Sequence, residues 1–140
     1  MAADKTPVLE VVALLTSGFE KSESATALRA IRPSADTVVF GTDRAEEWYG
    51  FDQLVDPFKV MASSIVGPSY SWCAPGPRVS LRGSVAWVVG ALSLEYGVPS
   101  AREVLRMRTT LVLSRDEDGG AIDHAHFSCG VEEGPQFAAR

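Results

Sequence analysis

The chain has 140 residues, of which 46% are apolar and 22% are charged, and its net charge is −5. This composition is that of an ordinary globular protein, and it excludes disordered, collagen-like and coiled-coil chains. A nucleic-acid-binding protein is also disfavoured, because phosphate binding requires clustered cations. We expect a single domain over residues 1–140, in which residues 131–140 form a loose tail without periodicity.

No stretch of the chain is apolar over the length of a membrane span, so no membrane contact is expected. The N-terminus has no apolar segment after a basic start, and we expect no secretory signal. Cys73 and Cys129 form no C-x-x-C pair and are interpreted as reduced thiols of a cytoplasmic protein. Nucleotide-binding glycine patterns, G-x-S-x-G and H-E-x-x-H are absent, so no cofactor is predicted.

Two helices are predicted in the first third of the chain. Thr6 and Pro7 are typical of an N-cap and a first helical position, because proline lacks the N–H that would be unpaired there. The apolar residues that follow recur at helical spacing: Val8, Val11, Val12, Leu15 and Phe19. A second helix is predicted over residues 24–31, where Ala25, Leu28 and Ile31 share a face and Pro33 ends the helix.

The next segment mixes a short strand, a loop and a helix. Residues 37–41 are β-branched or aromatic and predict a strand that ends at Gly41. Residues 42–50 are interpreted as a loop or a single turn, and the apolar stripe of residues 51–65 predicts a third helix. Pro57 leaves two alternatives open. It lies in the first turns of this helix, or Asp56 caps a new start and residues 51–55 form a separate turn.

The second half of the chain has the period of strands. Residues 69–80, broken by Pro75 and Pro77, predict a bulged or edge strand. Residues 84–95 are apolar on both faces and predict a central strand covered on both sides. Residues 102–115 alternate well, residues 116–120 form a hairpin turn, and residues 122–129 form the last strand. Helices followed by strands indicate an α+β fold with an antiparallel sheet packed on helices.

The last predicted strand carries both histidines of the chain. With a period of two, Ile122, His124, His126 and Ser128 share one face. Two imidazoles and a hydroxyl on one face can carry protons, bind a metal or form hydrogen bonds. A metal site is disfavoured, because no third ligand can be placed from the sequence. Histidines that are simply satisfied by their neighbours on a buried sheet are the structural alternative.

Arg106 and Arg108 share a face on the preceding strand, which a hairpin brings beside the histidine strand. If the two polar faces coincide, arginine and histidine converge on one cavity wall suited to a carboxylate or an enolate-like oxygen. If they do not, the arginines form a solvated face.

The loop of residues 42–50 concentrates acids and aromatics. Trp48 and Tyr49 in a loop are typical of a pocket mouth, where a ring offers apolar contact and a polar handle. The alternative is that both rings only cover the core. Asp43, at the start of this loop, is the candidate carboxylate.

This ordered set of segments resembles the SnoaL-like branch of the nuclear transport factor 2-like (cystatin-like cone) superfamily over residues 7–128. The likeness lies in residues 40–50 (FGTDRAEEWYG), residues 79–87 (VSLRGSVAW) and residues 108–128. The ending His124-Ala-His126-Phe-Ser128 is also similar to the hub domain of calcium/calmodulin-dependent kinases. The resemblance implies N-terminal helices packed on a strongly bent antiparallel sheet, which forms a cone with a central cavity.

The resemblance also implies positions for the site residues and an assembly. Trp48 and Tyr49 would border the cavity mouth, and Arg108, His126 and His124 would lie on its sheet wall. Such domains usually pair sheet against sheet, so we expect a homodimer through the outer sheet face.

Two functions of different classes follow. In the first, the cavity takes a small hydrophobic, oxygenated ligand, and the protein binds it or acts as a cofactor-free lyase, isomerase or cyclase. His126 or Asp43 would then move a proton, Arg108 would stabilise an oxyanion, and Ser128 would contact the ligand. In the second, the domain is a non-catalytic dimerisation or scaffold module.

Overall fold

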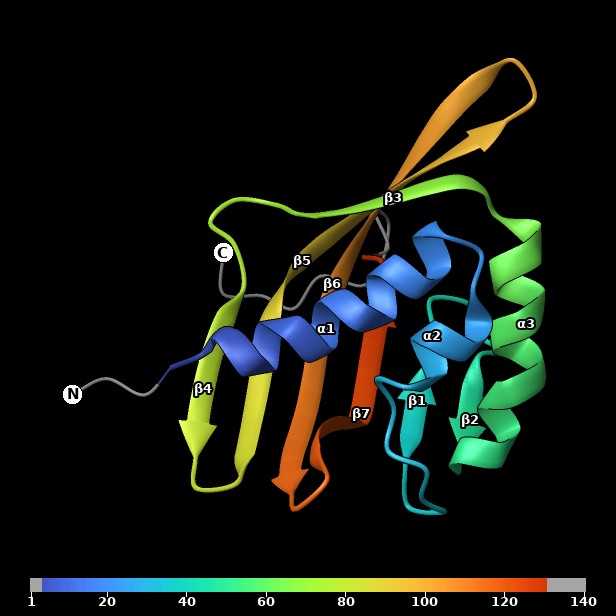
Figure 1. Ribbon diagram of the computed structural model, residues 1–140. Coiled ribbons are helices and arrows are strands. Elements are labelled where there is room, and N and C mark those ends of the chain that lie inside the picture. Colours follow the sequence, from blue (N-terminus) through green and yellow to red (C-terminus); the bar gives the residue numbers. More distant parts are fainter. Residues whose placement is uncertain (1–3, 131–140) are drawn as a thin grey trace, which may run out of the picture.

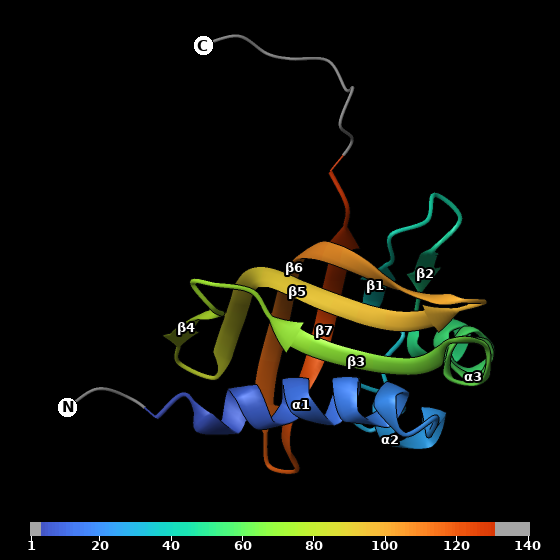
Figure 2. The same cartoon turned by 90° about the horizontal axis from the view of Figure 1, so that it is seen from above.

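The computed structural model describes residues 4–130, so the predicted tail of residues 131–140 lies outside the described part (Figure 1). Three α-helices and one short 3-10 helix lie on one side of a curved sheet. They are α1 (Thr6–Glu20), α2 (Ser24–Leu28), η1 (Phe51–Leu54) and α3 (Val55–Ser64). Figure 2, seen from above, shows the long strands curving around these helices.

The sheet has seven strands in the order β2-β1-β7-β6-β5-β3, and β4 also pairs with β5. The bounds are β1 (Val38–Phe40), β2 (Glu47–Tyr49), β3 (Val66–Trp72), β4 (Arg78–Arg82), β5 (Val85–Val98), β6 (Ala101–Asp116) and β7 (Gly119–Ser128). All neighbouring strands are antiparallel except β1 and β7, which are parallel. The predicted α+β fold is therefore present, with a sheet that is mixed rather than wholly antiparallel.

The first helix forms where its apolar stripe predicts it. Val12, Leu15 and Phe19 are buried on its inner side. Thr6 is the first helical residue rather than the cap, and its N–H donates to Asp4 Oδ1 at 2.9 Å. That hydrogen bond lowers the pKa of the Asp4 carboxyl, because it stabilises the charged form.

The second helix is shorter than predicted and ends at Leu28. The backbone beyond it is held by β7 instead. The N–H of Ile122 donates to Ala30 O at 2.8 Å, and the N–H of Arg32 donates to Ile122 O at 2.9 Å. Residues 30–32 therefore run beside the sheet, and no local signal in the sequence distinguishes this pairing from another helical turn.

The segment between β1 and α3 contains a strand that was not predicted, and it shows where Pro57 lies. Residues 47–49 form β2, which pairs with β1, so residues 42–50 are more than a loop. Phe51–Leu54 forms a separate 3-10 turn, and α3 begins at Val55. Pro57 lies in the first turn of α3, where its missing N–H leaves no hydrogen bond unmade.

The central strand β5 is covered on one face only in the described chain. Val88 and Leu92 are buried beneath the helices, whereas Val85 and Val89 on the opposite face are 38% and 43% exposed. The apolar residues on the outer face are therefore not explained by packing within one chain. β3 and β4, predicted as a bulged or edge strand, both pair with β5 at the sheet margin.

Candidate functional site

The concave sheet face and the helices line a cavity of about 240 Å³ that is partly open to solvent. Its walls come from α1, α3, the β1–β2 loop and the inner faces of β3, β5, β6 and β7. The lining residues are Val12, Leu15, Thr16, Phe19, Ile31, Val39, Gly41, Thr42, Glu46, Trp48, Phe58, Met61, Ile65, Tyr70, Leu92, Leu94, Tyr96, Leu105, Met107, Leu111, Ala125 and Phe127. The cavity lies between the main core cluster and a smaller one of Leu92, Leu94 and Met107.

Strand register explains why these side chains point inward. Trp48 pairs with Val39, Val39 pairs with Ala125, and Ala125 pairs with Leu111. Directly paired residues project to the same face of a sheet, so this row of four shares the concave side. Trp48 therefore lies in the cavity wall as a half-buried residue, and its role in contacting a ligand stays a prediction.

The polar groups of the lining are few, and most are neutral. The lining residues that carry polar groups are Thr16, Thr42, Tyr70 and Tyr96 with hydroxyls, Trp48 with an indole N–H and Glu46 with a carboxylate. Burial, and to a smaller extent the charge of Glu20, raises the pKa of Tyr70 to about 12. The Tyr70 phenol is therefore protonated at neutral pH and is a potential hydrogen-bond donor to a ligand.

Glu46 is held in place by its own loop. Its Oε1 accepts a hydrogen bond from the N–H of Asp43 at 2.9 Å, and its backbone N–H donates to Asp43 O at 2.9 Å. The N–H of Gly41 closes the hairpin by donating to Glu46 O at 2.8 Å. These bonds hold the side chain of Glu46, a residue of the cavity lining, in one orientation against its own loop.

The histidines lie on the opposite face from the one they were predicted to share with Ile122. Leu113 pairs with Ile122 and Val112 pairs with His124, so Asp123 is an extra residue that forms a bulge in β7. A bulge reverses the alternation. Ile122 therefore faces the core and is fully buried, whereas His124 and His126 face outward.

The arginines share this outer face. Arg108 pairs with Ser128, and Thr110 pairs with His126. The two polar faces therefore coincide, as one alternative required, but they coincide on the outer side of the sheet. The expectation that Arg108, His126 and His124 line the cavity is wrong, because the helices cover the face that carries Met107, Leu111 and the alternate residues of β7.

The outer side of β2, β1 and β7 carries an aromatic cluster that we call the outer aromatic cluster: Phe40, Tyr49, His124 and His126. The ring of Phe40 lies 5.6 Å from that of His124 and 5.5 Å from that of His126, both edge to face. His124 Nδ1 is 2.7 Å from Val38 O. The hydrogen bond that Tyr49 donates to Glu47 raises the pKa of Tyr49.

Two further predicted residues also lie away from the cavity. Tyr49 is 56% exposed in the outer aromatic cluster, so it does not border the mouth. Asp43 is exposed, and its Oδ1 accepts a hydrogen bond from the N–H of Ala45 at 2.8 Å. It shapes the loop that positions Glu46, the carboxylate that the sequence reasoning missed. The sequence offers one signal for Glu46: residues two apart in a strand point to the same face, so Glu46 shares the face of Trp48.

Residues 4–130 also bear on metal binding and on membrane crossing. No group of three or more His, Cys, Asp or Glu side chains in this range is close enough to hold a metal ion. No helix in the same range is both long and apolar enough to cross a membrane.

The folded chain is similar to several solved structures at low sequence identity. A proposed calcium/calmodulin-dependent protein kinase II association domain from Xanthomonas campestris has 15% identity and a TM-score of 0.78, covering 94% of this chain and 91% of that one. A proposed dehydratase of the NTF2-like family from Streptomyces avermitilis has 15% identity and a TM-score of 0.78, covering 90% and 95%. A protein with a cystatin-like fold from Nostoc punctiforme has 12% identity and a TM-score of 0.72, covering 94% and 95%.

These similarities establish the fold, an α+β cone of the nuclear transport factor 2-like, cystatin-like type. No curated protein sequence matches the chain. The sequence model of the SnoaL-like domain, however, matches residues 11–132, which is most of the chain. The protein therefore belongs to the SnoaL-like family.

Proposed function

We propose that this protein binds a small, largely apolar molecule in its central cavity. The observation that carries the proposal is the cavity itself: about 240 Å³ of space walled almost entirely by apolar side chains. Small-molecule sites are typically concave and lined mainly by apolar side chains, so a space of this kind between the helices and the sheet favours ligand binding. It is slightly smaller than the roughly 300–1,000 Å³ of pockets for drug-sized ligands, which favours a compact ligand.

Naphthalene is a suitable first probe because it is rigid, neutral and apolar. We expect it to bind the wild-type protein, with chemical-shift changes confined to methyl groups of the cavity lining. Thr16→Phe places a ring at a half-buried lining position of α1 and should abolish binding. Ala13→Phe, at an exposed position of the same helix, is the matched control and should bind normally. Unaltered methyl shifts in the wild-type protein would exclude the proposal.

A catalytic function of the kind that the family resemblance implies, a lyase, isomerase or cyclase without a cofactor, needs a proton carrier near the ligand. The roles predicted for His126, Asp43 and Arg108 remain predictions, and none of the three lines the cavity. Glu46 and the Tyr70 hydroxyl do line it, and they are the groups better placed to exchange a proton with a bound molecule. Activity that survives His126→Ala but is lost in Glu46→Ala would assign the role to the cavity carboxylate.

A second function, assembly into a homodimer, is favoured by the outer sheet face. Val85 and Val89 are exposed there, and Arg82 lies 5.7 Å from the ring of Trp87. The outer aromatic cluster extends the same face across β7, β1 and β2. Pairing two copies through this surface would cover apolar area that a monomer exposes to water. It would also give Arg108, His124, His126 and Ser128 a partner surface.

Sedimentation of the purified protein tests the assembly. We expect a dimer, and we expect Val89→Glu to yield monomers because it places a charge in the interface. Val60→Glu, at a position on α3 that is 61% exposed, is the control and should remain dimeric. A wild-type protein that sediments as a monomer at every concentration would exclude this function.

A further inference from the structure

The ionisable groups of the cavity wall suggest which ligands it prefers. Resting on the proposed binding function, we propose that the cavity favours a small hydrophobic amine, whose ammonium group binds to Glu46, over neutral and anionic molecules of the same skeleton. Among the described lining residues there is one carboxylate and no Lys, Arg or His. An anionic ligand would therefore lose its hydration without gaining a cationic partner.

The Glu46 carboxylate has one oxygen that a ligand can use. Oε1 accepts the hydrogen bond from Asp43 N–H, and no hydrogen bond from residues 4–130 reaches Oε2. A carboxylate that is already oriented by its loop loses little side-chain entropy when it binds an ammonium group. Charge-assisted hydrogen bonds of this kind are about twice as strong as neutral ones.

Gly41 makes room for this arrangement. A Cβ atom built at position 41 would lie 2.5 Å from Glu46 Oε1 and 2.8 Å from Glu46 Cβ. Any side chain there would push the Glu46 side chain from its place on the cavity wall. The position of the carboxylate therefore depends on a glycine as well as on the hairpin hydrogen bonds.

The rest of the wall is also suited to a cation. Aromatic rings line the cavity from several elements: Phe19, Trp48, Phe58, Tyr70, Tyr96 and Phe127. The faces of such rings attract cations, and the attraction grows where water is excluded. Glu20, whose Oε2 accepts the Tyr70 N–H at 2.8 Å, adds a second negative charge near the cavity wall. The aromatic ring faces and the negative charge of Glu20 both favour an ammonium group on the ligand and disfavour a carboxylate.

The size of the cavity limits the ligand. At a filling density between that of an organic liquid and that of a protein interior, about 240 Å³ holds a molecule with on the order of ten non-hydrogen atoms. One fused aromatic ring system with a short amine arm satisfies this limit.

Calorimetry with three matched probes tests the proposal: 2-naphthylmethylamine, 2-naphthalenemethanol and 2-naphthoate, all at neutral pH. We expect the amine to bind about tenfold more tightly than the alcohol, and the carboxylate to bind more weakly than both. Glu46→Gln should bring the affinity for the amine to within about twofold of the affinity for the alcohol. Glu47→Gln, an exposed neighbour on the outer face, changes the net charge equally and should keep the preference.

Gly41→Ala provides a second route if Glu46→Gln proves unstable. It keeps every charge but displaces the carboxylate, so it should also reduce the amine preference. Equal binding of amine and alcohol to the wild-type protein would overturn this inference and leave the binding function intact. An amine preference that survives in Glu46→Gln would overturn it too. Failure of all three probes to bind would overturn the proposed function itself.

Discussion

Tyr70 combines the packing and the charge of the cavity in one side chain. Its ring packs against both core clusters, and its backbone N–H donates to Glu20. Its pKa is raised from the ordinary value of 10.0 to about 12, first because the phenol is buried and second because of the charge of Glu20. Ionisation is therefore more costly in the folded chain than in the unfolded one.

This shift predicts how stability depends on pH. Because the folded pKa lies above the unfolded one, the contribution of Tyr70 is fully present below pH 10 and is lost as the pH rises toward about 12. The loss should reach on the order of 2 kcal/mol. Urea unfolding across this range measures it. Tyr70→Phe should flatten the decline more than Tyr49→Phe does, because the pKa of Tyr49 is also raised but its phenol lies at the surface rather than in the core. A decline that is equal in both variants would contradict the assignment.

At Gly18, α1 approaches α2 closely. A Cβ atom at this position would lie 2.4 Å from the backbone N of Ala27 and 2.7 Å from its Cα. Ala27 is fully buried, so the second helix has no free space into which to move. The glycine is needed here for close approach rather than for an unusual backbone conformation.

Gly18→Ala should therefore destabilise the protein by about 1–3 kcal/mol, although alanine is the better helix former by about 1 kcal/mol. Chemical denaturation of the two proteins measures the difference in free energy of unfolding. Thr16→Ala, two residues earlier in the same helix, is the control and should change the free energy of unfolding little. An increase in stability for Gly18→Ala would show that the helices separate without cost.

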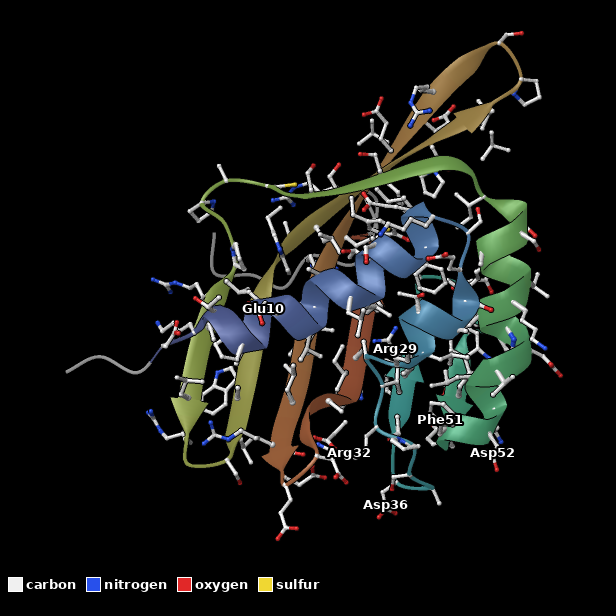
Figure 3. All side chains as sticks on the ribbon, in the orientation of Figure 1. Glu10, Arg29, Arg32, Asp36, Phe51 and Asp52 are labelled. Atoms are coloured by element: carbon white, nitrogen blue, oxygen red, sulfur yellow. The ribbon has the colours of Figure 1, made fainter. Side chains whose placement is uncertain are left out.

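At the scale of elements, the bulge in β7 decides which side chains reach the cavity. It lies where Arg32, just beyond α2, is bonded to the ends of β6 and β7 (Figure 3). Arg32 Nε is 3.3 Å from Asp123 Oδ1, and Arg32 NH1 is 2.6 Å from Asp116 Oδ2. Arg32 Nη2 donates a hydrogen bond to Ser114 O at 2.7 Å. One guanidinium thus joins the helical layer, the bulged residue and the hairpin.

Replacing this guanidinium should loosen the β6–β7 hairpin. We expect Arg32→Ala to lower the free energy of unfolding by about 1–3 kcal/mol, because it leaves the partly buried acceptors on Asp123 and Ser114 without their charged donor. Hydrogen exchange should accelerate most at residues 113–123. Arg29→Ala, an exposed position labelled in the same figure, is the control. Unchanged exchange in the hairpin would contradict the anchoring role.

At the scale of the whole molecule, one curved sheet separates two surfaces with different chemistry. Its concave face is apolar and encloses the cavity, whereas its outer face carries arginines, histidines and exposed valines. The two proposed functions use different sides, so a ligand and a second copy of the chain need not compete for the same residues.

Ligand binding should therefore stabilise the fold independently of assembly. At a free concentration of 100 times Kd, 2-naphthalenemethanol should raise the free energy of unfolding by about 2.7 kcal/mol. The same increase is expected in Val89→Glu, whose substitution lies on the outer face, and it should be absent in Thr16→Phe. Thermal or urea unfolding with and without the alcohol measures it. A gain that disappears in Val89→Glu would show that the cavity forms only in the assembled protein.

The element order could be predicted largely from local patterns. The stripe of α1, the alternation of β6 and the hairpin turn at 116–120 are local signals, since each depends on residues close in sequence. β2 was missed because three strand residues, Glu47–Tyr49, carry too little pattern without their partner β1. Of the candidate site residues, Trp48 lines the cavity, whereas the lining residues Glu46 and Tyr70 were not identified from the sequence.

Local periodicity was enough to predict an α+β domain in which long alternating strands follow the helices α1, α2 and α3, because the two periods follow from backbone geometry alone. It also determined which residues of β6 share a face. Which of the two faces encloses the cavity was decided only by tertiary structure. A period of two divides a strand into two sides but does not say which one the helices cover, and one bulged residue, Asp123, reverses the assignment for His124 and His126.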